Sequence, residues 1–154
     1  RVASEIHIPI ATGERLHTLE EFGMLLARNA CQYIRPDVCL CGGITQAKKI
    51  AAAAEARGVL VVPHNPLSPV STAACIQLAA SIPNFAIQEY PLGEDCAPKN
   101  EIVKSTLTLD NGYLTVPDSP GIGIELNEQA MHQYPYKPRL YVTKLREDGS
   151  VVDQ

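Results

Sequence analysis

The chain contains four short apolar runs that each end in an ionisable residue, and this recurrence constrains the fold more than any other feature. The ionisable residues are Glu14, Asp37, His64 and Glu89, separated by 23, 27 and 25 residues. These steps are close to the roughly 30-residue period of a strand, helix, strand unit. The spacing therefore predicts a repeating β/α barrel. Catalytic side chains of such barrels lie at the C-terminal ends of the strands, so the four residues are expected at one mouth.

Helical patterns separate the four runs. Strands are expected at residues 6–12, 33–40, 59–62 and 85–88, and helices at residues 19–29, 46–57 and 69–81. Thr18 and Glu21 fit a capping box at the first helix. Thr45 is the expected N-cap of the second helix, and Ser68 with Pro69 starts the third. Pro36 cannot donate to a strand ladder, which places Asp37 near a strand start or bulge.

The length of 154 residues suits half of a barrel, because a closed eight-stranded barrel typically needs about 250 residues. The chain also opens on Arg1 without an initiator Met, so we expect the C-terminal portion of a longer protein. We divide it into a half barrel at residues 1–92 and a segment at residues 93–154 that packs on the barrel or on a capping domain. In this segment the sequence predicts a hairpin turning at residues 110–112 and a short helix near residues 125–132.

Charge and hydropathy exclude some classes of function. The formal net charge of −4 argues against a nucleic-acid or anionic-membrane surface. No apolar segment approaches the roughly 20 residues of a membrane span, so a cytoplasmic protein is expected. Five cysteines, an odd number without a disulfide-like spacing, are expected to be buried and reduced, with Cys39 and Cys41 on one strand.

His64 and Asp37 are the first candidates for proton transfer. An imidazole at the end of an apolar strand can carry a proton, because imidazole titrates near neutrality. Asp37, one strand back, is placed to accept a bond from Nδ1 of His64 and to fix its tautomer. The sequence leaves two other interpretations open: a structural histidine bonded to nearby backbone, and a solvated turn aspartate.

Glu14 and Glu89 complete the set. Gly13 lets the backbone approach another group closely, and the carboxylate of Glu14 suits a hard cation such as Mg²⁺, although a salt bridge or a helix dipole is an equal alternative. Desolvation at a strand end is expected to raise the pKa of Glu89 and keep it protonated as a donor. Burial against an Arg or Lys is the rival account of Glu89.

Five motifs occur in order along the chain. They are residues 8–14 (IPIATGE), 35–37 with 42–45 (RPD and GGIT), 63–67 (PHNPL), 83–85 with 88–89 (PNF and QE) and 120–123 (PGIG). Together they resemble the C-terminal half of the enolase superfamily. Within it they are similar to the mandelate racemase subgroup, especially its sugar-acid dehydratases of the galactonate dehydratase type.

The resemblance implies a (β/α)₇β barrel with an α+β capping domain, of which this chain holds strands five to eight and the C-terminal part of the cap. It implies that Glu14 is the third ligand of a Mg²⁺ ion and that the Asp37–His64 dyad removes or returns the proton next to a substrate carboxylate. It also implies that Glu89 hydrogen-bonds that carboxylate as charge develops. The first two metal ligands fall outside the chain, which alone is expected to bind metal poorly and to catalyse nothing.

The resemblance therefore favours an enzyme, a Mg²⁺-dependent acid-sugar dehydratase and thus a lyase. His64, oriented by Asp37, abstracts the α-proton, and the β-hydroxyl leaves as water. A racemase or epimerase is the nearest alternative. A second class is an inactive, truncated or split half barrel that works by association with its own copy or with a separate N-terminal part, because half barrels expose strand edges. The expected partners are an acid sugar and, through a homo-oligomer or that N-terminal part, protein.

Overall fold

Three parallel strands form the centre of the structure, a computed structural model that describes residues 1–138, 144–150 and 152. The strands β1 (Ala11–Thr12), β2 (Tyr33–Ile34) and β3 (Leu60–Val61) lie side by side in sequence order. Ala11 is opposite Tyr33, and Tyr33 is opposite Leu60. Parallel neighbours in sequence order require a crossover between each pair. This arrangement agrees with the expected β/α repeat.

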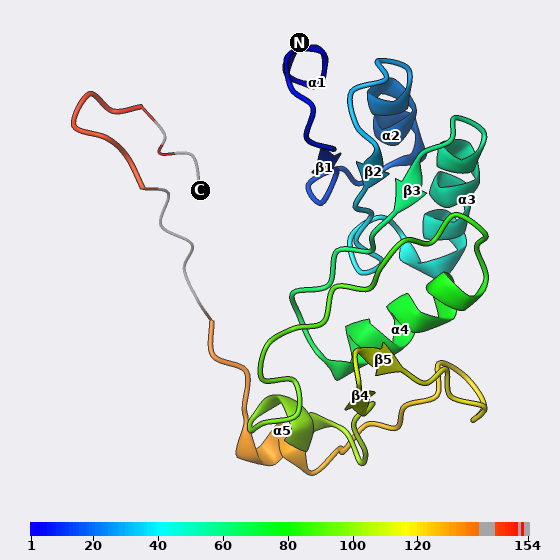
Figure 1. Cartoon of the computed structure of the whole chain (residues 1–154). Coiled ribbons are helices and arrows are strands. Elements are labelled where there is room, and N and C mark those ends of the chain that lie inside the picture. Colours follow the sequence, from blue (N-terminus) through cyan, green and yellow to red (C-terminus); the bar gives the residue numbers. More distant parts are fainter. Residues whose placement is uncertain (139–143, 151, 153–154) are drawn as a thin grey trace.

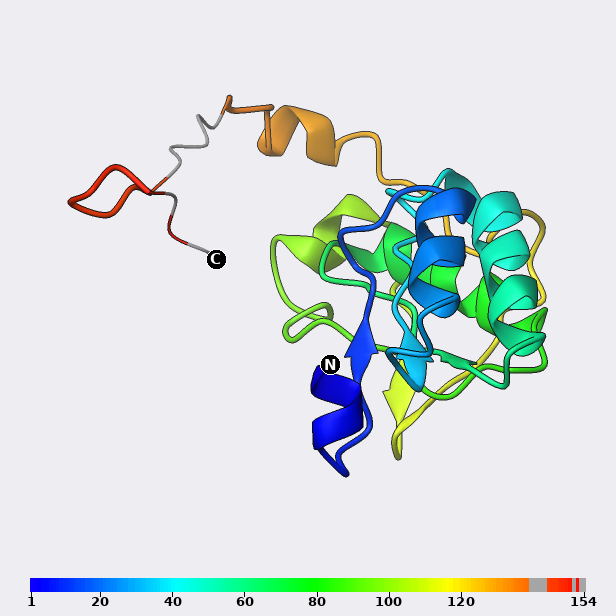
Figure 2. The same ribbon diagram turned by 90° about the horizontal axis from the view of Figure 1, so that it is seen from above.

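Helices fill the crossovers. α2 (Leu19–Leu26) connects β1 to β2, α3 (Gly43–Glu55) connects β2 to β3, and α4 (Pro69–Ala80) follows β3. The helices lie along one side of the sheet, and the other side is left open (Figures 1 and 2). No helix within the described residues is long and apolar enough to span a bilayer.

The fourth apolar run lies beside β3 but is not a full strand. Phe85 forms a single parallel bridge with Val61, supported by hydrogen bonds from Val61 N to Asn84 O (2.8 Å) and from Ala86 N to Val61 O (2.9 Å). The expected strand at residues 85–88 is thus correct in position and direction, and wrong in extent.

The other strands are also shorter than expected. Pro36 and Pro63 follow β2 and β3 closely, and neither has an N–H to donate to the ladder. Beyond these prolines the ladder resumes as one parallel bridge between Asp37 and His64, with His64 N donating to Pro36 O at 3.1 Å. The expected strand at residues 6–12 begins only at Ala11; residues 6–10 form neither helix nor strand, and the short helix α1 (Val2–Glu5) precedes them.

Capping residues start two of the three helices as expected. The Thr18 hydroxyl accepts from Glu21 N at 3.2 Å, and the Glu21 carboxylate accepts from Thr18 N at 3.0 Å, which confirms the capping box of α2. Ser68 caps α4, and Pro69 occupies its first turn. The prediction for α3 was wrong: the helix begins at Gly43 rather than after Thr45. Its N-cap is Gly42, whose φ of +99° lets the chain turn into the helix earlier.

The core lies between the sheet and the helices. Ile34 and Val61 point into it from β2 and β3 and are fully buried. They belong to one cluster with buried side chains of the helices: Phe22, Leu26, Ala47, Ile50, Ala51, Ala54 and Leu78. Gly13 is also required here. Its φ is +123°, and a Cβ at this position would lie 2.7 Å from the Phe22 ring, so the expected close approach is confirmed.

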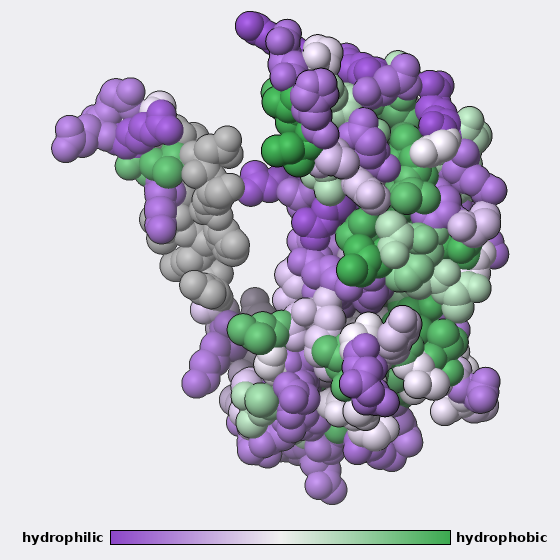
Figure 3. Space-filling view, viewed as in Figure 1, coloured by the Kyte–Doolittle hydropathy of each residue, from purple (hydrophilic) through white to green (hydrophobic). Residues whose placement is uncertain are grey.

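The opposite face of the sheet is open. Leu60, which alternates with the buried Val61, is 38% exposed. Apolar atoms gather on the surface over β3 and the coil that follows α4, where Ile87 is 64% exposed (Figure 3). The described half barrel therefore shows an uncovered apolar surface.

The segment after residue 92 contains the expected hairpin. β4 (Leu109–Asp110) pairs with β5 (Tyr113–Leu114), and both Asn111 (φ +48°) and Gly112 (φ +83°) adopt the positive φ of a tight turn. The hairpin, α4 and the preceding coil line a cavity of about 430 Å³.

In the described part of this segment there are also two short helices, η1 (Lys99–Ile102) and α5 (Ala130–Gln133). The expected helix near residues 125–132 is thus limited to α5. The division into 1–92 and 93–154 stays a prediction, and residues 139–143, 151 and 153–154 of the second range lie outside the described residues.

All five cysteines are free thiols, as expected, but only Cys31, Cys41 and Cys75 are buried. Burial raises the pKa of Cys41 to about 11 and that of Cys75 to about 12, which makes both thiols unreactive. Cys39 and Cys96 are exposed, so the expectation of five buried thiols was wrong. Cys39 and Cys41 lie in the turn after Asp37 rather than in a strand, because β2 ends at Ile34.

Candidate active site

His64 and Asp37 form a hydrogen-bonded pair beyond the C-terminal ends of β2 and β3. His64 Nδ1 lies 2.9 Å from Asp37 Oδ2, and the parallel bridge between the two residues holds their backbones side by side. Asp37 is 1% exposed, and its other oxygen accepts from Cys39 N at 2.8 Å. An ionised carboxylate only accepts, so Nδ1 must carry the proton and Nε2 is the nitrogen that can exchange one. This is the geometry expected from the sequence.

Glu89 lies next to this pair but in a different state from the expected one. Its Oε2 accepts from Arg35 Nη2 at 2.5 Å and from Asn65 N at 2.8 Å. Burial pushes the pKa of Glu89 up, but the Asn65 N–H and the Arg35 guanidinium, with a smaller effect of His64, hold it below its ordinary value of 4.5. The expectation of a protonated Glu89 was wrong; the rival account, pairing with an Arg, describes the contact.

Arg35 is a site residue that the sequence reasoning missed. It follows β2 and donates its backbone N–H to Thr12 O at 2.9 Å, which fixes the start of its side chain at the edge shared with Asp37. Its Nε is buried without a hydrogen-bond partner among the described residues. The signal was its spacing, because residues two apart in extended chain point to the same side, and Pro36 between them keeps the chain extended.

Asn65 is the second missed residue. It follows His64 and is fully buried, and its Nδ2 donates to the Glu89 backbone oxygen at 3.1 Å as well as to Thr72. Asn65 therefore holds Glu89 through both its backbone and its side chain. The sequence signal for this role was the position of Asn65 directly after His64, at the end of the apolar run 59–63.

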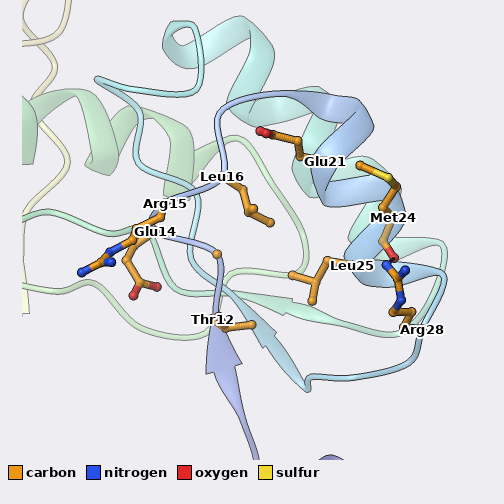
Figure 4. Close-up of a pocket in the computed structure, with 9 residues that line it drawn as sticks. Thr12, Glu14, Arg15, Leu16, Glu21, Met24, Leu25 and Arg28 are labelled. Carbon is orange, nitrogen blue, oxygen red and sulfur yellow. Dashed lines mark hydrogen bonds between the residues drawn. The ribbon is translucent and has the colours of Figure 1, made fainter. Parts of the chain in front are cut away.

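Glu14 lies one strand away. It lies two residues after the end of β1, is half-buried, and is at the same edge of the sheet as Arg35; Figure 4 shows it beside Arg15 in the loop before α2. The two residues also line a cavity of about 450 Å³ against α2, which contains none of Asp37, His64 and Glu89 and is therefore not the candidate active site.

The described residues do not form a metal site by themselves. No group of three or more His, Cys, Asp or Glu side chains among them could hold a metal ion. Mg²⁺ requires near-octahedral oxygen coordination, to which Glu14 alone contributes one carboxylate. The donor set of the described residues is thus incomplete for Mg²⁺.

Comparison with known proteins decides the family. The family model described as Enolase C-terminal domain-like matches residues 1–130. The chain belongs to this family. Its fold is accordingly α/β, the C-terminal half of a TIM-like barrel, and the resemblance to the enolase superfamily is confirmed.

Among its relatives, the chain is similar in sequence to proteins named as D-galactonate dehydratases. The chain is 35% identical to a D-galactonate dehydratase of Verminephrobacter eiseniae over 83% of its own length and 35% of the relative. It is also 35% identical to a D-galactonate dehydratase family member of Streptomyces bingchenggensis, over 95% of this chain and 36% of the relative. The chain thus spans about a third of the length of these relatives.

Solved structures agree with the fold. An enolase of Agrobacterium radiobacter, solved with sodium and L-malate, superposes with a TM-score of 0.86 at 34% identity, over 97% of this chain and 41% of that one. A mandelate racemase/muconate lactonizing enzyme from a Jannaschia species gives a TM-score of 0.82 at 35% identity, over 90% of this chain and 35% of that one. The chain is therefore similar to enzymes of the superfamily, and to dehydratases among them.

Proposed function

We propose that the whole protein is an acid-sugar dehydratase in which His64 removes the proton next to the substrate carboxylate. The observation that carries the proposal is the Asp37–His64 pair beyond the ends of adjacent parallel strands, where β/α barrels keep their catalytic groups. The names of the galactonate dehydratase relatives support it.

The chemistry follows from the pair. Nε2 of His64 takes the α-proton as its C–H bond breaks, and the buried Asp37 stabilises the resulting imidazolium. A double bond forms between the α- and β-carbons as the β-hydroxyl departs, and the proton and hydroxyl leave as one water. The enol tautomerises to a 2-keto-3-deoxy acid, so no electrons are exchanged with an outside reagent.

In this proposal Glu89 and Arg35 contact different polar groups of the substrate. An ionised Glu89 accepts a hydrogen bond from a sugar hydroxyl but cannot donate to a carboxylate. The guanidinium of Arg35, whose side chain is 26% exposed, provides the positive charge for the carboxylate and for the charge that develops on it.

The Mg²⁺ dependence of the family is also carried as a proposal. Glu14 is the ligand that we assign among the described residues, and the others would belong to parts of the full-length relatives that the chain does not span. Removal of divalent cations from the whole protein should then abolish turnover, and Mg²⁺ should restore it.

The test is product analysis with the whole protein. D-galactonate and related acid sugars are incubated with protein and Mg²⁺, and NMR should detect a 2-keto-3-deoxy acid. The H64N variant should form none while keeping its fold, and H132N, a change at an exposed histidine on α5, should behave as wild type. Full activity of H64N would refute the role of His64.

A racemase or epimerase is the second candidate, favoured by the mandelate racemase name of a solved neighbour. The same His64 would then return a proton to the α-carbon instead of allowing the hydroxyl to leave. The product analysis separates the two reactions, since an epimer of the substrate with no loss of water would identify this second candidate.

A further inference from the structure

Three fully buried polar side chains extend from Glu89 into the protein, namely Asn65, Thr72 and Glu94. Asn65 Nδ2 donates to Thr72 Oγ1 at 2.7 Å, and Thr72 Oγ1 lies 2.6 Å from Glu94 Oε2. Thr72 belongs to α4, while Glu94 comes from the coil beyond Glu89. A buried carboxyl group costs free energy unless its interactions compensate, so its presence calls for an explanation.

The hydrogen bonds of this set have one direction. The hydroxyl of Thr72 has a single proton, and because it donates that proton to Glu94 it can only accept from Asn65. The amide of Asn65 must therefore turn its NH₂ group toward Thr72. Its second N–H then reaches the backbone oxygen of Glu89, and its Oδ1 is left buried without a partner among the described residues.

Without Glu94 the direction is lost. Thr72 could then donate to Oδ1 of a flipped Asn65 amide, which would satisfy the orphaned oxygen but place it, rather than an N–H, against Glu89 O. The observed orientation leaves a polar atom unsatisfied, which is unfavourable by itself. Because Glu94 accepts the Thr72 proton, only the observed orientation of the Asn65 amide forms a hydrogen bond with Thr72.

We propose that Glu94 is a positioning residue: through Thr72 it fixes the Asn65 amide, and through Asn65 it holds Glu89 against Arg35 at the candidate active site. The proposal depends on the proposed function only in that Glu89 contacts the substrate.

The protonation of Glu94 does not change this direction. Burial raises the pKa of Glu94 above its ordinary value of 4.5, and the Thr72 hydroxyl and the Lys99 charge lower it by less. A carboxyl group protonated on Oε1 still accepts at Oε2, so Thr72 donates to it in both states.

The test compares variants that keep or remove one hydrogen bond, made in the whole protein. T72S keeps the hydroxyl and E94Q keeps an acceptor oxygen. T72V and E94M have nearly the same shapes as the native side chains but lack the hydroxyl and the acceptor oxygen, respectively. The first readout, independent of activity, is solvent exchange of the Asn65 side-chain NH₂ protons, followed by NMR with ¹⁵N-labelled asparagine. The second readout is kcat and KM with the acid sugar that the whole protein turns over.

We expect T72V and E94M to speed Asn65 NH₂ exchange at least about tenfold and to lower kcat by a similar factor with little change in KM, because small displacements near reacting groups cost rate. T72S and E94Q should stay near wild type in both readouts. If T72V does not fold, E94Q against E94M gives the same comparison.

Two controls separate positioning from stability. The double variant T72V/E94M removes both partners and should be more stable than T72V, which leaves Glu94 buried and unpaired, yet its kcat should stay low. N84S weakens a buried asparagine bonded to Ala51 O and Val59 O at the opposite end of the strands, and should lower stability with kcat within about twofold of wild type. Recovery of kcat together with stability in the double variant would overturn the proposal.

The experiments give different outcomes when the positioning role of Glu94 fails and when the proposed function fails. If the protein converts no acid sugar, the proposed function fails, and the Asn65 exchange rates still decide the role of Glu94. If it does convert one, and T72V and E94M match wild type in NH₂ exchange and kcat, the positioning role is refuted while the proposed function stands.

Discussion

At the scale of single residues, the sequence was sufficient to pair Asp37 with His64, because parallel strands end at one edge of a sheet. The Nδ1 to Oδ2 contact of 2.9 Å is the one expected. The state of Glu89 could not be predicted in this way, since it depends on Arg35, which lies 54 residues earlier in the chain. Arg35 precedes a proline and is easily taken for a turn residue, although its spacing from Asp37 indicates the shared side.

The ion pair predicts a specific pH dependence of stability. Folding lowers the pKa of Glu89, so its contribution is present above its ordinary value of 4.5 and is lost as the pH falls through the folded value. R35Q should raise that pKa and make the loss smaller. Urea midpoints at about pH 7 and about pH 3 measure the difference.

The matched control is K104Q, which breaks an ion pair between the exposed Lys104 and Glu125. Exposed pairs contribute little, so this variant should keep the acid dependence of wild type. An R35Q protein that loses as much stability on acidification as wild type would show that Arg35 does not set the state of Glu89.

At the scale of helices and strands, the sequence correctly predicted the features that depend on neighbouring residues only. The capping box at Thr18 and the turn at Asn111 and Gly112 were both found, because each depends on neighbours within a few residues. The start of α3 was misplaced, since the left-handed φ of Gly42 replaced a side-chain cap. The strand expected at residues 33–40 was overestimated because Pro36 interrupts the ladder after β2, an effect that depends on the partner strand.

The capping box gives a prediction for α2. T18A removes the oxygen that accepts from Glu21 N and should lower the free energy of unfolding by about 1 kcal/mol. T18S keeps the oxygen and serves as the control, with a loss of a few tenths at most. Chemical denaturation measures both, and equal losses in the two variants would mean that the hydrogen bond contributes nothing.

At the scale of the whole molecule, the steps of 23, 27 and 25 residues predicted the β/α repeat, and the family match confirms it. The positions of helices and strands relative to each other therefore followed from sequence. The apolar surface on the open face of the sheet did not follow from the sequence, because packing rather than local pattern decides which face of a sheet is covered. Leu60 on that face is 38% exposed.

The open face predicts association of the 154-residue chain when it is produced alone. Exposed sheet surface and strand edges pair readily, so gel filtration should show species larger than the 16.7 kDa monomer. L60E on the open face should shift the distribution toward monomer, and M24E, at the exposed Met24 of α2, should not. A monodisperse monomer of the unaltered chain would contradict this prediction.

The most direct test of the account is proton removal by His64. An acid sugar deuterated at its α-carbon is incubated with the whole protein, and the loss of deuterium to water is followed by NMR. Wild type should release the deuterium, D37N should release it at least about a hundredfold more slowly because the imidazole loses its charged partner, and H64N should release none. Release by H64N at the wild-type rate would contradict the account, because the proton would then leave through another group.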